Sequence, residues 1–105
     1  MFMSLIEELT EKGRGMHAYA ATAKTAFAQA SAHPDQAAAF YLLGKIAEEF
    51  VDLHERMPLS TEELNQFFGR YAAAAQALQD AEDKQDAAGM LAALNAVAGQ
   101  MAAKG

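Results

Sequence analysis

Three histidines are the first candidates for chemistry, because imidazole serves both as a metal ligand and as a general acid or base. A di-metal site built inside a helical bundle needs a glutamate three residues before a histidine, and His17, His33 and His54 all lack one. No His-x-x-x-His pair is present, which excludes the zinc-protease motif. Asp52 and Glu55 near His54 supply at most half of a metal site, so we interpret His54 as a surface residue near a helix C-terminus.

His17 suggests a second chemistry, phosphoryl transfer. Histidine phosphotransfer domains are helical bundles of about this size that present an exposed histidine among small residues, with a lysine further along the same helix. His17 lies in an alanine-rich segment and Lys24 follows it, but the lysine and glycine spacing typical of these domains is missing. A phosphorelay function is therefore a remote alternative.

The acidic segment 80–86 raises the question of a calcium site, since Ca²⁺ prefers carboxylate oxygens. An EF-hand loop needs oxygen ligands at alternate positions and glycine at the sixth. Counted from Asp80, Lys84 occupies the fifth position and Gln85 the sixth, so the pattern fails. We expect these acids to be solvated at a junction and to stabilise the N-terminus of the last helix.

Covalent catalysis has no candidate residue. The chain contains no cysteine, which excludes thiol nucleophiles, disulfides and Cys-ligated zinc. It lacks a Gly-x-Ser-x-Gly motif, and its Gly13-Arg14-Gly15 segment is too short for a phosphate-binding loop and has no lysine. We therefore predict no catalytic residue, no metal ligand and no cofactor. An aromatic group is either the lining of a ligand pocket or, more typically at helical spacing, part of the core: Phe40, Phe50, Phe67, Phe68 and Tyr71.

Length and charge limit the function further. A chain of 105 residues, 52% of them apolar, is expected to form one domain with a core. Its net charge of −6 disfavours phosphate backbones and anionic lipid, so we predict neither a nucleic-acid partner nor a membrane partner. The first residues include no basic leader, and the apolar stretches are far shorter than the roughly 20 residues of a membrane span. We expect a cytoplasmic location.

Helices are the expected elements, because the abundant alanines have the highest helix propensity. Glycines or prolines at 13–15, 33–34 and 57–59 break the pattern, and Ser-x-x-Glu capping boxes at Ser4 and Ser60 mark two helix starts. The segment 80–86 is either a turn or part of one long helix. We predict a single all-α domain, an up-down (antiparallel) four-helix bundle with a short N-terminal helix. The predicted helices cover about 4–12, 16–32, 34–56, 60–81 and 84–103.

The helix predicted at 34–56 is apolar around more than half of its circumference. A helix of that kind is normally buried on most sides, and the helix at 16–32 offers few large residues to cover it. We therefore predict that this surface meets a second copy of the chain. The candidate interface residues are Phe40, Leu43, Ile46, Phe50 and Val51.

Three glycines are predicted to be close-packing positions. In an antiparallel pair that turns near 57–59, Gly44 lies level with small residues of helix 60–81. In a pair that turns near 83–84, Gly89 lies level with Leu78 and Gly99 with Phe68, so that large residues meet small ones. On this interpretation, a larger side chain at Gly99 lowers stability.

These observations favour a non-catalytic helical module for protein–protein interaction that self-associates, most simply as a homodimer. The alternative is a small acidic inhibitor or regulator that docks on a basic site of a partner, and the acids along 48–55 and 80–86 motivate it. A metal-binding or phosphorelay-type bundle is the remote third interpretation. None of the three identifies the partner or the cellular process.

Overall fold

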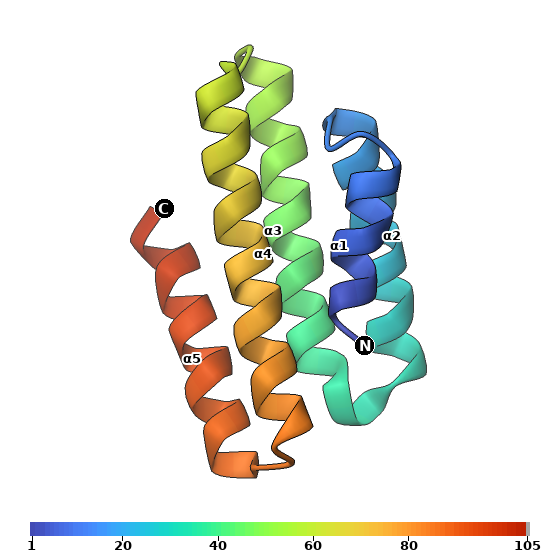
Figure 1. The fold of residues 1–105 in the computed structure, drawn as a ribbon, viewed down its shortest axis with the longest axis vertical. Helices are drawn as coiled ribbons and strands as arrows, with labels where there is room; N and C mark the ends of the chain where they lie inside the picture. Colours follow the sequence, from blue (N-terminus) through green and yellow to red (C-terminus); the bar gives the residue numbers. More distant parts are fainter. Residues whose placement is uncertain (105) are drawn as a thin grey trace.

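The computed structural model describes the backbone of residues 1–104 and the side chains of residues 1–103. Within these residues the chain is all-helical, with five α-helices, one short 3₁₀ helix and no strand (Figure 1). The helices lie side by side in a body of 39 × 27 × 18 Å. Their bounds are Met3–Glu11 (α1), Met16–Ala32 (α2), Pro34–Gln36 (η1, the 3₁₀ helix), Ala37–Arg56 (α3), Thr61–Asp83 (α4) and Ala87–Lys104 (α5).

The predicted helices are confirmed with small shifts at their ends. The segment after His33 begins with η1, since proline suits a first helical turn, and becomes α-helical at Ala37. At 80–86 the structure has a turn: α4 continues to Asp83, and residues 84–86 separate it from α5. Gln85 has a φ of +51° in that turn, a left-handed conformation of the kind that ends helices.

One of the two predicted capping boxes is confirmed and the other is wrong. The Ser60 hydroxyl accepts from the Glu63 N–H at 3.1 Å, and the Glu63 carboxylate accepts from the Ser60 N–H at 3.2 Å. Ser4 lies inside α1, which already begins at Met3, and its hydroxyl donates to the Met1 carbonyl at 2.7 Å. The Ser4 hydroxyl therefore donates to a carbonyl that precedes the helix and does not cap a backbone N–H.

α1 is part of the core. Phe2, Leu5 and Leu9 are fully buried, and the edge of the Phe2 ring meets the Phe40 ring at a centroid distance of 4.9 Å. The Phe2 N–H donates to the Gln79 side-chain oxygen at 2.8 Å. This bond fixes the start of α1 against α4, where its apolar side chains enter the space between the longer helices.

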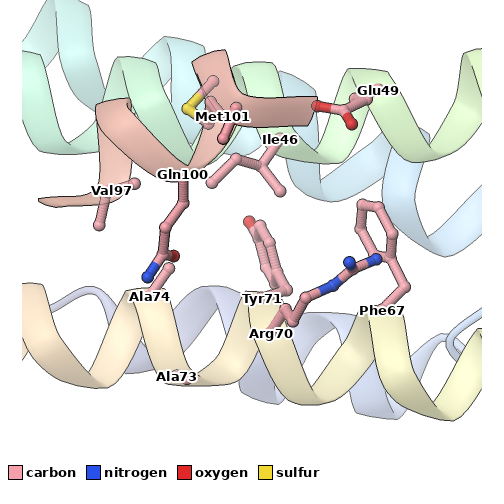
Figure 2. Close-up of a pocket in the computed structure, with 11 residues that line it drawn as sticks. Ile46, Glu49, Phe67, Arg70, Tyr71, Ala73, Ala74, Val97, Gln100 and Met101 are labelled. Atoms are coloured by element: carbon pink, nitrogen blue, oxygen red, sulfur yellow. The ribbon is translucent and has the colours of Figure 1, made fainter. Parts of the chain in front are cut away.

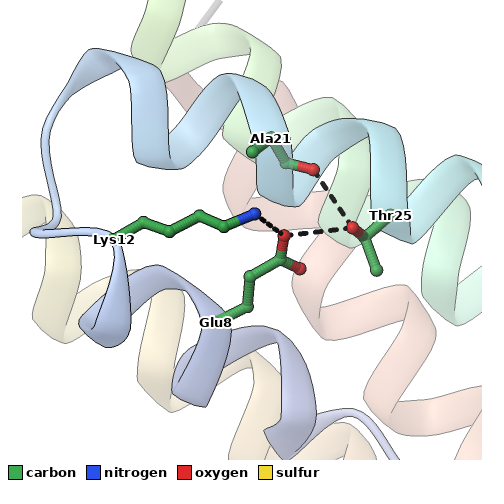
Figure 3. A network of polar contacts seen from close by, with 4 residues as sticks. All are labelled: Glu8, Lys12, Ala21 and Thr25. Carbon is green, nitrogen blue, oxygen red and sulfur yellow. Dashed lines mark hydrogen bonds and ion pairs between the residues drawn. The ribbon is translucent and has the colours of Figure 1, made fainter.

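A polar contact joins α1 to α2 on the other side (Figure 3). One carboxylate oxygen of Glu8 accepts from the Lys12 ammonium at 2.8 Å and from the Thr25 hydroxyl at 3.2 Å. The Thr25 hydroxyl also lies 3.2 Å from the Ala21 carbonyl of its own helix. A single carboxylate therefore links two helices at the edge of the core.

The short N-terminal helix α1 is packed more deeply into the core than α5. α1 contacts α2 and α4, α2 contacts α3, and α3 contacts α4, whereas α5 contacts only α4 and α3 among the described elements. In α5, Val97 is the one buried residue among the described side chains. Side-chain size contributes to this difference, because Phe2 and the two leucines of α1 fill the core, whereas eight of the 18 residues of α5 are alanine.

The centre of the core is aromatic. Tyr19 of α2 stacks on Phe50 of α3 at 3.8 Å between ring centroids, and Phe67 of α4 meets both rings edge-on at 5.0–5.6 Å. Tyr71, one turn further along α4, meets Tyr19 at 5.8 Å. The core interpretation of the aromatic group is therefore confirmed for its buried members Phe40, Phe50, Phe67 and Tyr71.

Three of the five predicted interface residues are wrong as surface positions. Phe40, Leu43 and Phe50 have at most 1% of their area exposed, because α2 and α4 pack against the sides of α3 that carry them. Ile46 and Val51 are partly buried against the same core. The apolar surface of α3 is thus buried within one chain, so a homodimer interface would have to lie on another surface.

Of the three glycines, Gly44 is a close-packing position, but its neighbour lies on α2. A Cβ atom at Gly44 would lie 2.6 Å from the Phe27 ring. At Gly89 the nearest group is the carboxylate of Asp86, three residues earlier in the chain, at 2.9 Å. Gly99 has no neighbour within 4 Å, so its predicted contact with Phe68 is wrong: the last helix turns this small face outward.

Among the side chains that the structure describes, three hydroxyl groups inside the core have no protein hydrogen-bond partner: those of Tyr19, Thr22 and Tyr71. Burial raises the pKa of Tyr19 to about 12, and the Arg14 guanidinium opposes this rise. Burial also raises the pKa of Tyr71, and the nearby Tyr19 and Glu8 raise it further. Both phenols are therefore held neutral, in surroundings that do not solvate the phenolate.

The first prediction concerns Gly44. Gly44→Leu lowers the free energy of unfolding by about 1–3 kcal/mol, because the side chain has to displace the Phe27 ring in a packed interface. The matched variant Gly69→Leu places the same side chain on α4, where nothing lies within 4 Å, and raises stability by about 0.5–1 kcal/mol through helix propensity. Urea denaturation of both variants measures the difference; equal effects contradict the close approach of α2 and α3.

The second prediction concerns pH. In the unfolded chain the tyrosines ionise near pH 10, whereas Tyr19 and Tyr71 of the folded protein ionise only at higher pH. The free energy of unfolding is therefore largest below pH 10 and falls as the pH rises toward 12. Tyr71→Phe reduces this fall, and at pH 7 it raises stability by about 1 kcal/mol because it removes an unpartnered buried hydroxyl. Denaturation curves across this pH range test both effects. Tyr41→Phe is the control, because Tyr41 is 53% exposed and its hydroxyl is not confined to the core.

Candidate functional site

The histidines and acids do not gather into a metal site. Within the side chains that the structure describes, no three His, Cys, Asp or Glu residues lie where they could hold one ion. His17 and His33 are exposed at opposite ends of α2, and His54 lies in the last turn of α3 with its ring 5.6 Å from that of Phe50. The remaining candidates are therefore helix surfaces and cavities.

α5 differs from the other helices in charge and in burial. Residues 87–103 contain no Asp, Glu, Lys or Arg. A helix without charged residues is normally buried, yet most described residues of α5 are exposed. Leu91 has 59% of its area exposed, more than any other large hydrophobic side chain described. This helix therefore presents apolar surface to solvent.

The exposed surface of α5 has a regular pattern. Met90, Leu94 and Met101 point toward α3 and α4 and are partly buried against the core. Beside this row on the helix surface, exposed residues recur at alternating spacings of three and four, the spacing of a coiled-coil seam. We call this row the α5 stripe; it consists of Ala88, Leu91, Asn95, Ala98 and Ala102.

The turn before α5 fixes where the stripe faces. The Asp86 carboxylate accepts from the Ala88 N–H at 3.1 Å, as an N-cap residue does, and the Asp86 carbonyl accepts from the Met90 N–H at 2.8 Å. The positive φ of Gln85 reverses the chain just before this cap. These contacts place the start of α5 beside the end of α4, and the partly buried residues of α5 meet the core from outside.

A cavity of about 380 Å³ lies between α3, α4 and the C-terminal half of α5 (Figure 2). Its polar side chains are Glu49, Arg70 and Gln100, and within the described residues Glu49 and Arg70 form no ion pair with each other. The volume is within the range of small-molecule sites. The small side chains of α5 leave this space unfilled. The rest of the lining is apolar except for the Tyr71 hydroxyl, and it comprises Ile46, Phe67, Tyr71, Ala73, Ala74, Val97, Met101 and Ala103.

Val51, the other partly buried interface candidate, lies elsewhere. It lines a second hollow of about 330 Å³ between α2 and α3, together with Phe27. Lys24, Glu48 and Asp52 also line this hollow. The structure thus separates Ile46 from Val51, and the charged residues beside Val51 make its surroundings unlike the apolar centre of a stable interface.

The sequence carries a signal for the α5 stripe, which is the uncharged run 87–103. The prediction of a dense seam between helices 60–81 and 84–103 assigned these small residues to the interior. Periodicity alone identifies faces of a helix but not which face meets a neighbour. Once α1 occupies part of the core, the outer face of α5 has nothing to cover it.

Among residues 1–104, no helix combines the length and the apolarity that a membrane span requires. No family model, no curated protein and no solved structure matches the chain.

Proposed function

We propose that this protein is a non-catalytic interaction module that forms a homodimer through the α5 stripe. The observation that carries the proposal is the combination of an uncharged sequence and an exposed position in one helix. Residues 87–103 contain no charge, and the stripe is exposed along its whole length. Contiguous exposed apolar surface on a small protein is typical of an interaction site.

Electrostatics favours a second copy at this surface. Two copies each carrying a net charge of −6 repel each other wherever acidic faces meet. At the α5 stripe no charge has to be desolvated or brought close to a like charge, so the apolar contact is not opposed there. The depletion of charge at the stripe is also the composition expected at the core of an interface.

The side chains of the stripe suit a helix–helix contact. Alanine occupies three of the five positions of the stripe and allows two helices to approach closely, while Leu91 supplies a large apolar side chain that is 59% exposed in one chain. Burying such a leucine contributes about 1.5–3 kcal/mol for full burial. A contact built on one helix predicts a modest affinity, with the dimer populated at micromolar concentrations and above.

A specific observation also supports the second candidate function, an acidic regulator. Glu48, Asp52 and Glu55 are exposed on α3, and among the described residues Lys45 pairs with Glu48 alone of these three, at 3.2 Å. Asp52 and Glu55 thus form no ion pair among the described residues, and their carboxylates are available to a basic site of a partner. Pull-down from a lysate at low and moderate salt tests this candidate, and a specific partner lost at moderate salt supports it.

The third prediction tests the dimer. Wild-type protein at tens of micromolar elutes with the mass of a dimer in size-exclusion chromatography with light scattering, and Leu91→Glu elutes as a monomer because it places two carboxylates in the apolar contact. The thermal stability of the Leu91→Glu monomer matches that of diluted wild type, since Leu91 lies outside the core.

The matched control for this experiment is Ala77→Glu, which adds the same charge at an exposed position of α4. This variant keeps the dimer mass. A wild-type monomer across the concentration range contradicts the proposed self-association, and a dimer that survives Leu91→Glu contradicts the α5 stripe as its interface.

A further inference from the structure

We infer that the two copies pair along α5 in the antiparallel direction, with Leu91 of each copy against Ala102 of the other and Asn95 against Ala98. This inference rests on the proposed homodimer and specifies its geometry. Three properties of α5 carry it: the order of large and small residues along the stripe, the charge at the start of the helix, and the place of Asn95.

The first property is the order of side-chain sizes. The stripe alternates between two sets of heptad positions, Ala88, Asn95 and Ala102 in one and Leu91 and Ala98 in the other. In an antiparallel pair, a residue of one set faces a residue of the other set. Leu91 then meets the small Ala102, and large and small side chains interdigitate, as dense packing requires.

A parallel pair gives the opposite result, because each residue of the stripe meets its own copy. The two Leu91 side chains then meet and hold the helices apart, while the paired alanines at 98 and 102 face each other across a gap. Voids of this kind forfeit dispersion contacts on both sides. Packing therefore favours the antiparallel direction.

The second property is the acidic turn at the start of α5. Asp83 and Asp86 are exposed there, with Asp80 one turn earlier in α4. A parallel pair places two such turns side by side, where like charges repel. In the antiparallel register given above, the two Asp86 residues lie about 32 Å apart along the helix direction, and the two helix dipoles also align favourably.

The third property is the position of Asn95, the one polar residue of the stripe. In the antiparallel register, the twofold axis passes between residues 96 and 97, and the two Asn95 residues lie on either side of it, about 4.5 Å apart along the helix direction. Their amides can donate and accept across the axis. A single polar residue in an otherwise apolar seam is a known means of fixing register.

Engineered cysteines test the direction, because the chain contains no cysteine of its own. Leu91→Cys and Ala102→Cys chains are prepared separately, mixed in equal amounts and oxidised. In the antiparallel pair, residue 91 faces residue 102 of the partner, so the mixture forms a disulfide between the two variants, which intact mass identifies. Each variant alone forms no disulfide, since its two copies of the same residue lie about 16 Å apart along the helix, beyond the roughly 7 Å limit for a disulfide.

Two controls keep the result interpretable. Light scattering under reducing conditions establishes that each cysteine variant still dimerises, and Ala102→Cys alone, which keeps Leu91 intact, forms a disulfide only in a parallel pair. Ala77→Cys, exposed on α4, reports random collisional cross-linking and is expected to remain monomeric by mass after oxidation.

The outcomes separate this inference from the proposed function. Cross-linking of the mixture alone supports the antiparallel pair. Cross-linking of Leu91→Cys with itself and of Ala102→Cys with itself overturns it in favour of a parallel pair, and leaves the homodimer standing. A dimer by light scattering without any of these cross-links overturns the α5 contact itself. A wild-type monomer overturns the proposed function and this inference with it.

Discussion

The structure depends on the stack between Tyr19 and Phe50, whose ring centroids lie 3.8 Å apart. This stack joins α2 to α3, and Phe67 closes it from α4 by meeting both rings edge-on. Aromatic pairs of this kind contribute energy beyond their buried area and require defined geometry. Three helices are thereby fixed around one point, and the remaining two have to fit the surfaces that this arrangement leaves.

α1 fits because its connection to α2 is also held in place. Gly13 and Arg14 adopt positive φ angles of 93° and 61°, which reverse the chain within three residues. The guanidinium of Arg14 then lies 3.8 Å over the ring of Phe68 on α4, a cation–π contact that ties the loop to the opposite helix. The short helix α1 is thus held at both ends, at this loop and at the Gln79 side chain that accepts from Phe2, and its leucines complete the core.

α5 is left with the outer position and a composition that does not suit solvent. Its inner side chains cover α3 and α4 only in part, and a cavity of about 380 Å³ stays beneath its C-terminal half. Its exposed side chains between residues 87 and 103 are uncharged, and most of them are small. Exposed apolar surface of this kind is costly in water. The proposed homodimer buries it without bringing the acidic faces of the two copies together.

The amino-acid sequence by itself determined the helices, because alanine propensity, Pro34 and the Ser60 capping box act within a few residues of the chain. It also indicated the apolar face of α3, but not what covers that face. Only the tertiary structure placed Phe40, Leu43 and Phe50 in the core, gave Gly44 a neighbour on α2 and turned Gly99 outward. The physical reason is that periodicity records which side of a helix avoids water, whereas the choice of neighbour depends on the side-chain volumes of all the helices packed together.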